Sequence, residues 1–194
     1  SYGGRHDKDG LDSIDCLIAN TRNNPIEELE WRFPMRTERY ELREEPCAAG
    51  KWRGGIGTVR VNRFLVDTMV TCEGERNESD PPWGVFGGHD GVNASTKITK
   101  PDGTVEYWPS KFTGRTLSAG STIEIVVPNS GGYGDPLERD PELVLSDVLD
   151  GFTTAELAER DYRVVIDVER RTIDHEATRR LREQGRAGAR SPAT

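Results

Sequence analysis

Histidine and cysteine are both scarce in this chain. Its 194 residues include three of each, and the cysteines, Cys16, Cys47 and Cys72, contain no Cys-x-x-Cys pair. Structural zinc sites are usually built from such pairs. A zinc-finger-like site is therefore not expected, and a site that needs several histidine ligands cannot be assembled from this chain alone. Widely spaced cysteines in odd number are typical of free thiols in a reducing compartment.

The chain also lacks long apolar runs and an excess of positive charge. No stretch approaches the roughly 20 apolar residues that span a bilayer, and the first residues show no apolar signal region. Asp and Glu number 34 against 26 Lys and Arg, a net charge of −8, whereas a nucleic-acid-binding face needs a basic patch. We expect a cytoplasmic protein that binds neither nucleic acid nor membrane.

Glycine and proline, by contrast, are abundant. The chain has 21 glycines and 11 prolines, which favour many turns. Apolar residues make up 34% of the sequence, so the hydrophobic core should be modest. The length fits one domain.

Strand-like patterns fill the middle of the chain. At residues 57–66, Val59 and Val61 alternate with polar side chains, and this period of two predicts a strand with one solvated face. Further strands are predicted at residues 68–72 and 122–127, with a hairpin around a Pro-Asp-Gly turn at residues 97–107. The middle of the molecule should therefore be antiparallel β-structure.

Helical patterns lie on both sides of these strands. Asn24 and Pro25 are typical of an N-cap and a first helical turn, and Pro34 should end that short helix. A second helix is predicted at residues 141–149, closed by Gly151. A third, short helix should begin at the capping box of residues 153–156. A terminal strand at residues 161–167 and a last helix at residues 174–184 follow.

The predicted fold class is α+β, a β-rich body of antiparallel strands with short C-terminal helices. We divide the chain into a polar loop and short helix (residues 1–35), the antiparallel β-rich body (36–130), a glycine-rich turn with the C-terminal helices (131–184) and a disordered tail (185–194).

Several motifs, in order along nearly the whole chain, resemble the C-terminal third of the hydantoinase B/oxoprolinase family. Each is weak alone, but together they strongly indicate the family. They are Asp-Gly-Leu-Asp at residues 9–12, Asn-Thr-Arg-Asn at 20–23, Glu-Arg-Tyr-Glu-Leu-Arg at 38–43, Gly-Lys-Trp-Arg-Gly-Gly-Ile-Gly at 50–57, Pro-Pro-Trp-Gly at 81–84 with Gly-Gly at 87–88, Pro-Ser-Lys at 109–111 and Gly-Gly-Tyr-Gly-Asp-Pro at 131–136.

The resemblance implies a role in a multisubunit complex. Family members act with an actin-like, hydantoinase-A-type ATPase subunit in the ATP-dependent opening of cyclic amides such as 5-oxoproline or hydantoins, through a phosphorylated substrate. Related complexes carboxylate ketones such as acetone or acetophenone. The implied cofactor is ATP with Mg, held by the partner ATPase, and a divalent metal would have its ligands mainly outside this chain.

B-type subunits of this family are usually far longer than this chain. The implied partners therefore include the remaining N-terminal part of a B-type subunit, together with the ATPase subunit and a small-molecule substrate. Three functions stay open: a segment or split subunit of an ATP-dependent amidohydrolase, a subunit of a ketone carboxylase, and a non-catalytic structural subunit.

One departure from the family concerns the first candidate site. Many relatives place His-x-His before the Asn-Thr motif, where this chain has Asp15, Cys16 and Leu17. An imidazole pair that could bind metal or move protons is thereby replaced by one carboxylate, a thiol and an aliphatic group. This weakens a direct transfer of hydrolase activity.

The candidate site residues come from two segments. The first segment should enter a site shared within the complex, with Arg22 as an anion clamp and Asp15 as a base or ligand; alternatively, its Asn and Thr side chains cap their own turns. The candidates are Asp12, Asp15 and Arg22 as catalytic residues, Asn20, Thr21 and Asn23 as substrate-binding residues, and Gly131, Gly132, Tyr133, Gly134 and Asp135 as a subunit interface or site rim. For the last five, a strand-to-helix turn that needs positive φ is the other interpretation.

Overall fold

The structure is a computed structural model that describes residues 1–15, 19, 21–77 and 80–189, with the side chains of residues 186–189 excepted. The strands are β1 (Met35–Leu42), β2 (Thr58–Phe64), β3 (Thr68–Glu73), β4 (Ser95–Thr99), β5 (Val105–Trp108), β6 (Lys111–Leu117), β7 (Thr122–Val126), β8 (Ile166–Asp167) and β9 (Thr172–Ile173). The helices are α1 (Ile26–Arg32), the 3-10 helix η1 (Pro136–Glu138), α2 (Pro141–Leu149), α3 (Ala155–Tyr162) and α4 (His175–Ala189). The fold class is α+β, as predicted.

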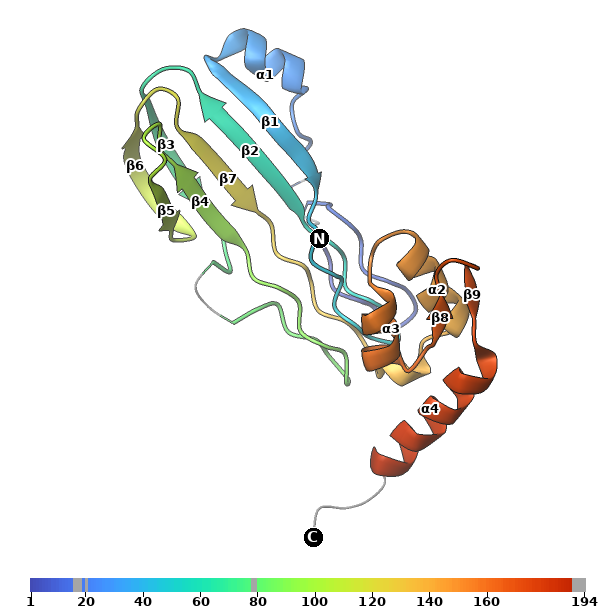
Figure 1. The fold of residues 1–194 in the computed structure, drawn as a ribbon. Helices are drawn as coiled ribbons and strands as arrows, with labels where there is room; N and C mark the ends of the chain where they lie inside the picture. The colour runs from blue at the N-terminus through green and yellow to red at the C-terminus, as the bar shows by residue number, and fades with distance from the viewer. Residues whose placement is uncertain (16–18, 20, 78–79, 190–194) are drawn as a thin grey trace.

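The main sheet has five strands in the order β1-β2-β7-β4-β5, and its neighbouring strands all run antiparallel. Strands β3 and β6 pair as a separate ribbon, and so do β8 and β9. Figure 1 shows the sheet at one end of the molecule and α2, α3 and α4 at the other, with long extended segments between them. The predicted hairpin at residues 97–107 is confirmed by the antiparallel pair β4–β5, with Gly103 in its turn at φ +85°.

The two faces of the main sheet differ in what covers them. Ile98, Trp108 and Ile123 form a buried cluster with Phe112 and Leu117 of β6, so the β3–β6 ribbon packs on this face, which we call the inner face. The ribbon lies toward β4 and β5 (Figure 1), and the cluster beneath it reaches β2 at Phe64. Directly paired residues in antiparallel strands point to the same side of a sheet.

Strand β2 places an arginine on this inner face. Arg60 pairs with Tyr40 of β1 and with Ile125 of β7, and Ile125 packs against the inner-face cluster. Val59 and Val61, although buried, point to the outer face. The period of two is therefore confirmed, but the polar side of β2 faces the same way as the core.

Between the sheet and the helices, extended segments pack backbone against backbone. A Cβ added at Gly132 would lie 2.1 Å from the carbonyl oxygen of Ala49, and one at Gly131 would lie 2.2 Å from that of Trp83. Contacts this short exclude any side chain. Within the predicted glycine turn, only Gly134 has a positive φ, of +75°. Close approach, more than turn geometry, requires the first two glycines.

The helices at the other end share a second core. Val144 of α2, Ala158 and Tyr162 of α3, and Val164 and Ile173 are buried together. Asp140 caps α2 by accepting a hydrogen bond from Glu142 N at 3.0 Å, ahead of Pro141 in the first turn. Gly151 follows α2 with φ +81°, as predicted.

Several predicted boundaries are wrong. Pro25, not Asn24, is the N-cap of α1, and no side chain caps it. Residues 161–162 belong to α3, because Tyr162 is buried in the helical core; only two residues of the predicted strand at 161–167 form β8. Helix α4 continues to residue 189, beyond its predicted end at residue 184.

Candidate functional site

The N-terminal segment lies beside β1 and β2 on the inner face and is fixed to residues 53–57. Gly10 N donates to the carbonyl oxygen of Arg53 at 2.8 Å, and Ser13 N donates to that of Ile56 at 2.8 Å. These bonds hold residues 13–15 next to β1 and β2. A cavity of about 310 Å³ lies there, lined by Asp15 and Asn23 from the segment and by Tyr40 and Arg60 from the strands.

Polar contacts connect the lining residues. Asn23 Nδ2 donates to the Tyr40 hydroxyl at 2.5 Å, and Arg60 Nη1 contacts Asn23 Oδ1 at 3.5 Å. The Arg60 guanidinium carbon lies 4.5 Å from the centre of the Tyr40 ring, a cation–π distance. The Thr21 hydroxyl donates to Asp15 Oδ2. The structure thus brings together three of the predicted residues, Asp15, Thr21 and Asn23.

Asp12 has a different environment from Asp15. It accepts two hydrogen bonds from Arg53, at 2.9 and 3.1 Å, and one from the backbone of Ile56 at 2.9 Å. Burial alone would raise the pKa of the Asp12 carboxyl, but the bonds from Arg53 and Ile56 outweigh burial, and the pKa lies below its usual range. A carboxylate held in this way is a weak base and a good anchor for the segment.

Arg53 is one member of a larger buried charge network. Asp147 accepts from Arg53 Nε at 3.2 Å and from Arg139 Nε at 3.0 Å, and Arg139 makes a bidentate pair with Asp9 at 2.7 and 2.9 Å. Burial raises the pKa of Asp147, although the two guanidinium groups oppose this shift. The network ties the N-terminal segment, the residue 50–57 loop and helix α2 to one another.

The remaining predicted residues lie as follows. Arg22 is exposed on the same segment, and Asn20 and Cys16 lie outside the described residues. Gly131, Gly132 and Gly134 are buried, whereas Tyr133 is half-buried and Asp135 is exposed. Asp135 caps η1 by accepting from Leu137 N at 2.9 Å, and the backbone of Tyr133 pairs with that of Trp52. Only Tyr133 and Asp135 are thus available at the surface for a rim or an interface.

Neither Cys47 nor His89 supports thiol or metal chemistry in this chain. Burial raises the pKa of the Cys47 thiol to about 12, which leaves no useful thiolate at neutral pH. His89 is exposed in a surface loop. In the part of the chain that the structure describes, no three His, Cys, Asp or Glu side chains form a group that could hold a metal ion. These residues therefore do not by themselves fit a metal site.

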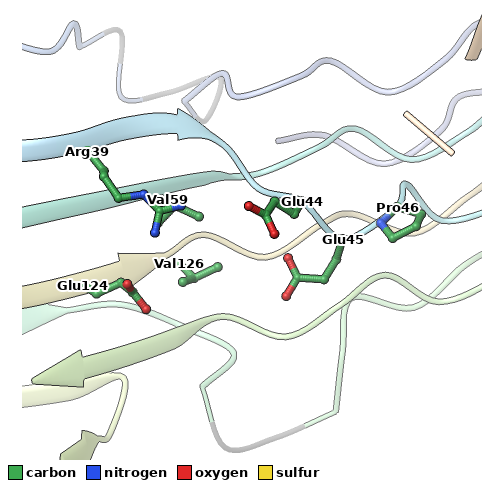
Figure 2. Close-up of a pocket in the computed structure, with 7 residues that line it drawn as sticks. All are labelled: Arg39, Glu44, Glu45, Pro46, Val59, Glu124 and Val126. Atoms are coloured by element: carbon green, nitrogen blue, oxygen red, sulfur yellow. The ribbon is translucent and has the colours of Figure 1, made fainter. Parts of the chain in front are cut away.

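A larger hollow of about 510 Å³ lies on the outer face. Figure 2 shows Glu44 and Glu45 on the segment after β1, across the strand ends from Glu124. Two of these carboxylates are already paired, Glu45 with Arg43 at 3.0 Å and Glu124 with Lys97 at 2.8 Å. Their charges are compensated within the chain, so the cavity at Arg60 is the better candidate for a ligand.

Sequence reasoning missed Tyr40 and Arg60 as members of the site. In the sequence both belong only to strand-like or family motifs. The one available signal is a basic residue at an alternating polar position of β2, and such a residue is ordinarily solvated. As a separate finding, no helix in the described residues is both long and apolar enough to cross a membrane.

Comparison with known proteins places these features in a family. The family model for hydantoinase B/oxoprolinase matches residues 1–136, more than half of the chain. The putative B-type subunit of a D-/L-hydantoinase from Pseudomonas sp. (strain NS671) is 49% identical over 184 residues, which cover 94% of this chain and 31% of that protein. The chain therefore spans about a third of the length of this curated relative.

Two solved structures share the fold. The ATP-dependent caprolactamase from Pseudomonas jessenii matches with a TM-score of 0.67 and 31% identity, over 83% of this chain and 28% of that one. A nucleotide-free acetone carboxylase matches with a TM-score of 0.74 and 19% identity, over 97% of this chain and 30% of that one. The resemblance found in the sequence motifs is confirmed: the chain belongs to the hydantoinase B/oxoprolinase family.

Proposed function

We propose that this chain is a segment of a hydantoinase-B-type subunit in a complex that opens cyclic amides at the expense of ATP. The observation that favours this function is the 49% identity to a relative named as the B-type subunit of a hydantoinase. A second relative, 31% identical, is named as the beta subunit of a caprolactamase. Both names denote the opening of a cyclic amide, whereas the acetophenone carboxylase delta subunit is 28% identical.

The proposed reaction divides between two subunits. The hydantoinase-A-type ATPase, which binds ATP and Mg, phosphorylates the amide oxygen of the substrate. Water then adds to the activated ring carbon in the B-type subunit, and the C–N bond breaks with a proton passing to the ring nitrogen, which leaves an acyl phosphate. A second water hydrolyses this acyl phosphate to the free carboxylate and inorganic phosphate. A carboxylate beside the reacting water would take its proton.

Within this segment, Asp15 is the better candidate for that carboxylate. It lines the cavity and accepts a hydrogen bond from the Thr21 hydroxyl, while both oxygens of Asp12 are occupied by Arg53. Arg22, exposed on the same segment, is proposed as a clamp for the phosphorylated substrate. Asp12 would position the segment through Arg53.

The test is ATP turnover by the complex reconstituted from this chain, the rest of its B-type subunit and the A-type subunit. Cyclic amides (5-oxoproline, a hydantoin) should stimulate ATP hydrolysis, and ketones with bicarbonate should not. Stimulation by ketones with bicarbonate, and not by cyclic amides, would replace the proposal with a carboxylase. Asp15→Ala should lower turnover at least about a hundredfold, the lower end of what a general base typically contributes.

The matched control is Asp7→Ala, which removes an exposed carboxylate from the same segment. It should leave turnover unchanged. If Asp15→Ala and Arg22→Ala also leave turnover unchanged in an assembled complex, the segment has a structural role and the shared-site proposal fails.

A further inference from the structure

The Arg60 guanidinium has one edge without a protein partner. Nε and Nη2 are shielded from solvent, and neither has a hydrogen-bond partner among the described residues. A buried donor without a partner is unfavourable, because folding has removed its water and supplied nothing in return. Nη1, on the other edge, makes only the long contact with Asn23 at 3.5 Å.

The two unpartnered atoms form a fork that matches a carboxylate. Nε–H and Nη2–H point in parallel from one edge of the planar group, and their spacing fits the two oxygens of a carboxylate. Two other guanidinium groups described above, those of Arg53 and Arg139, both donate hydrogen bonds to carboxylates, which belong to Asp12, Asp9 and Asp147. Arg60 lines a cavity and has no such partner within the described chain.

The other side chains of the cavity narrow the ligand class. Asp15 is the one acidic side chain among the described lining residues, and Arg60 is the one basic side chain. A ligand with two negative charges, such as phosphate, would be repelled by Asp15 without gaining a second cationic side chain. A single carboxylate is balanced by Arg60, and an amide N–H on the same ligand could be accepted by Asp15.

We propose that Arg60 and the cavity beside it form a subsite for a small organic monocarboxylate that also carries an amide N–H. The carboxylate accepts two hydrogen bonds from the Nε–Nη2 fork, and the Tyr40 ring supports the guanidinium from its other side. Binding requires the fork to turn toward the cavity, and the 3.5 Å contact with Asn23 offers little resistance to this rotation. The inference rests on the proposed function only in assigning this cavity to the substrate site.

The test is calorimetric titration of the assembled complex, without ATP, with N-acetylglycine as the probe. Its N-methylamide keeps the amide groups but lacks the carboxylate, so wild-type complex should bind it at least about tenfold more weakly. Arg60→Met should weaken N-acetylglycine binding by at least about tenfold, which corresponds to about 1.4 kcal/mol. Arg60→Lys keeps the charge but not the fork and should give an intermediate loss.

Arg63→Met is the matched control. Arg63 lies on the same strand but points to the outer face, where it pairs with Glu38, and its loss should change probe binding by less than about twofold. Equal binding of the probe to wild type and Arg60→Met would overturn the proposal. So would absence of binding to wild type, or equal binding of the N-methylamide, neither of which depends on how a variant folds.

The test of the Arg60 subsite and the test of the proposed function can fail independently of each other. A complex that turns over 5-oxoproline, a cyclic amide that carries a carboxylate, equally well with Arg60→Met retains the proposed function and refutes the subsite. A complex that binds N-acetylglycine through Arg60 but hydrolyses no cyclic amide retains the subsite and refutes the proposed function.

Discussion

Replacing Arg139 by Met should destabilise the chain by about 3–5 kcal/mol, the usual cost of stranding buried charges. The Arg139 side chain is 1% exposed. It donates to both oxygens of Asp9, to Asp147 and, at 3.1 Å, to the carbonyl oxygen of Lys51. Met replaces the apolar stem of Arg and lacks only the guanidinium end, so the loss reports on the missing charge and hydrogen bonds more than on packing of the stem.

The magnitude follows from what the substitution leaves behind. In the native network two guanidinium groups, Arg53 and Arg139, face three carboxylates, Asp9, Asp12 and Asp147. Without Arg139, one guanidinium faces three carboxylates. Each charge-assisted hydrogen bond contributes about 1.5–3 kcal/mol, but Asp9 is partly exposed and regains water, so the four lost bonds do not add up.

The assay is urea unfolding followed by tryptophan fluorescence at neutral pH. Arg160→Met is the control, because the Arg160 side chain is 68% exposed and its ion pair is with the neighbouring Asp161; its cost should stay below about 1 kcal/mol. If Arg139→Met costs no more than this control, the network does not hold the N-terminal segment to the helices, and the reasoning is refuted.

Two further predictions concern the glycine-packed segments and the pH dependence of stability. Gly132→Ala should cost about 3 kcal/mol in the same assay, since the new Cβ would lie 2.1 Å from a backbone oxygen, whereas Gly3→Ala, at 3.3 Å from its nearest atom, should cost far less. Asp12 has a lowered pKa in the folded chain, so its contribution is present above its unfolded pKa and is lost as pH falls through the folded value. Asp12→Asn should therefore show a smaller loss of stability between about pH 5 and pH 2 than wild type in acid titrations, and an unchanged acid limb would contradict the Asp12–Arg53 assignment.

The sequence was sufficient for elements whose signals are local. The β4–β5 hairpin was predicted from its turn residues, and α2 from Pro141 and the closing Gly151. Strand β6 was missed, because Gly114, at φ +63°, and several polar residues interrupt its pattern next to a register shift. The C-terminal strand was mistaken because burial of Tyr162 in the helical core overrides its β propensity.

The site depends on contacts that no local pattern encodes. Asp12 and Arg53 are separated by 41 residues, and Arg53 and Asp147 by 94. The alternation in β2 predicts two faces but cannot tell which face another segment will cover. It therefore predicts a solvated Arg60, although the strand turns this residue toward the side on which the β3–β6 ribbon packs.

The glycine motifs are explained by the packing of the fold, whereas the candidate site concerns its chemistry. Gly131 and Gly132 are required because backbones meet there with no room for a Cβ, and this need would persist whatever reaction the complex performs. Asp15, Tyr40 and Arg60 line a cavity with their side chains, where a substitution should leave the packing of the backbones intact. The glycine pattern therefore reflects how the backbones of this fold pack and does not depend on the reaction. The residues around Arg60 are where differences in substrate should be sought, and exchanging Asp15 or Arg60 tests function without disturbing the glycine-packed segments.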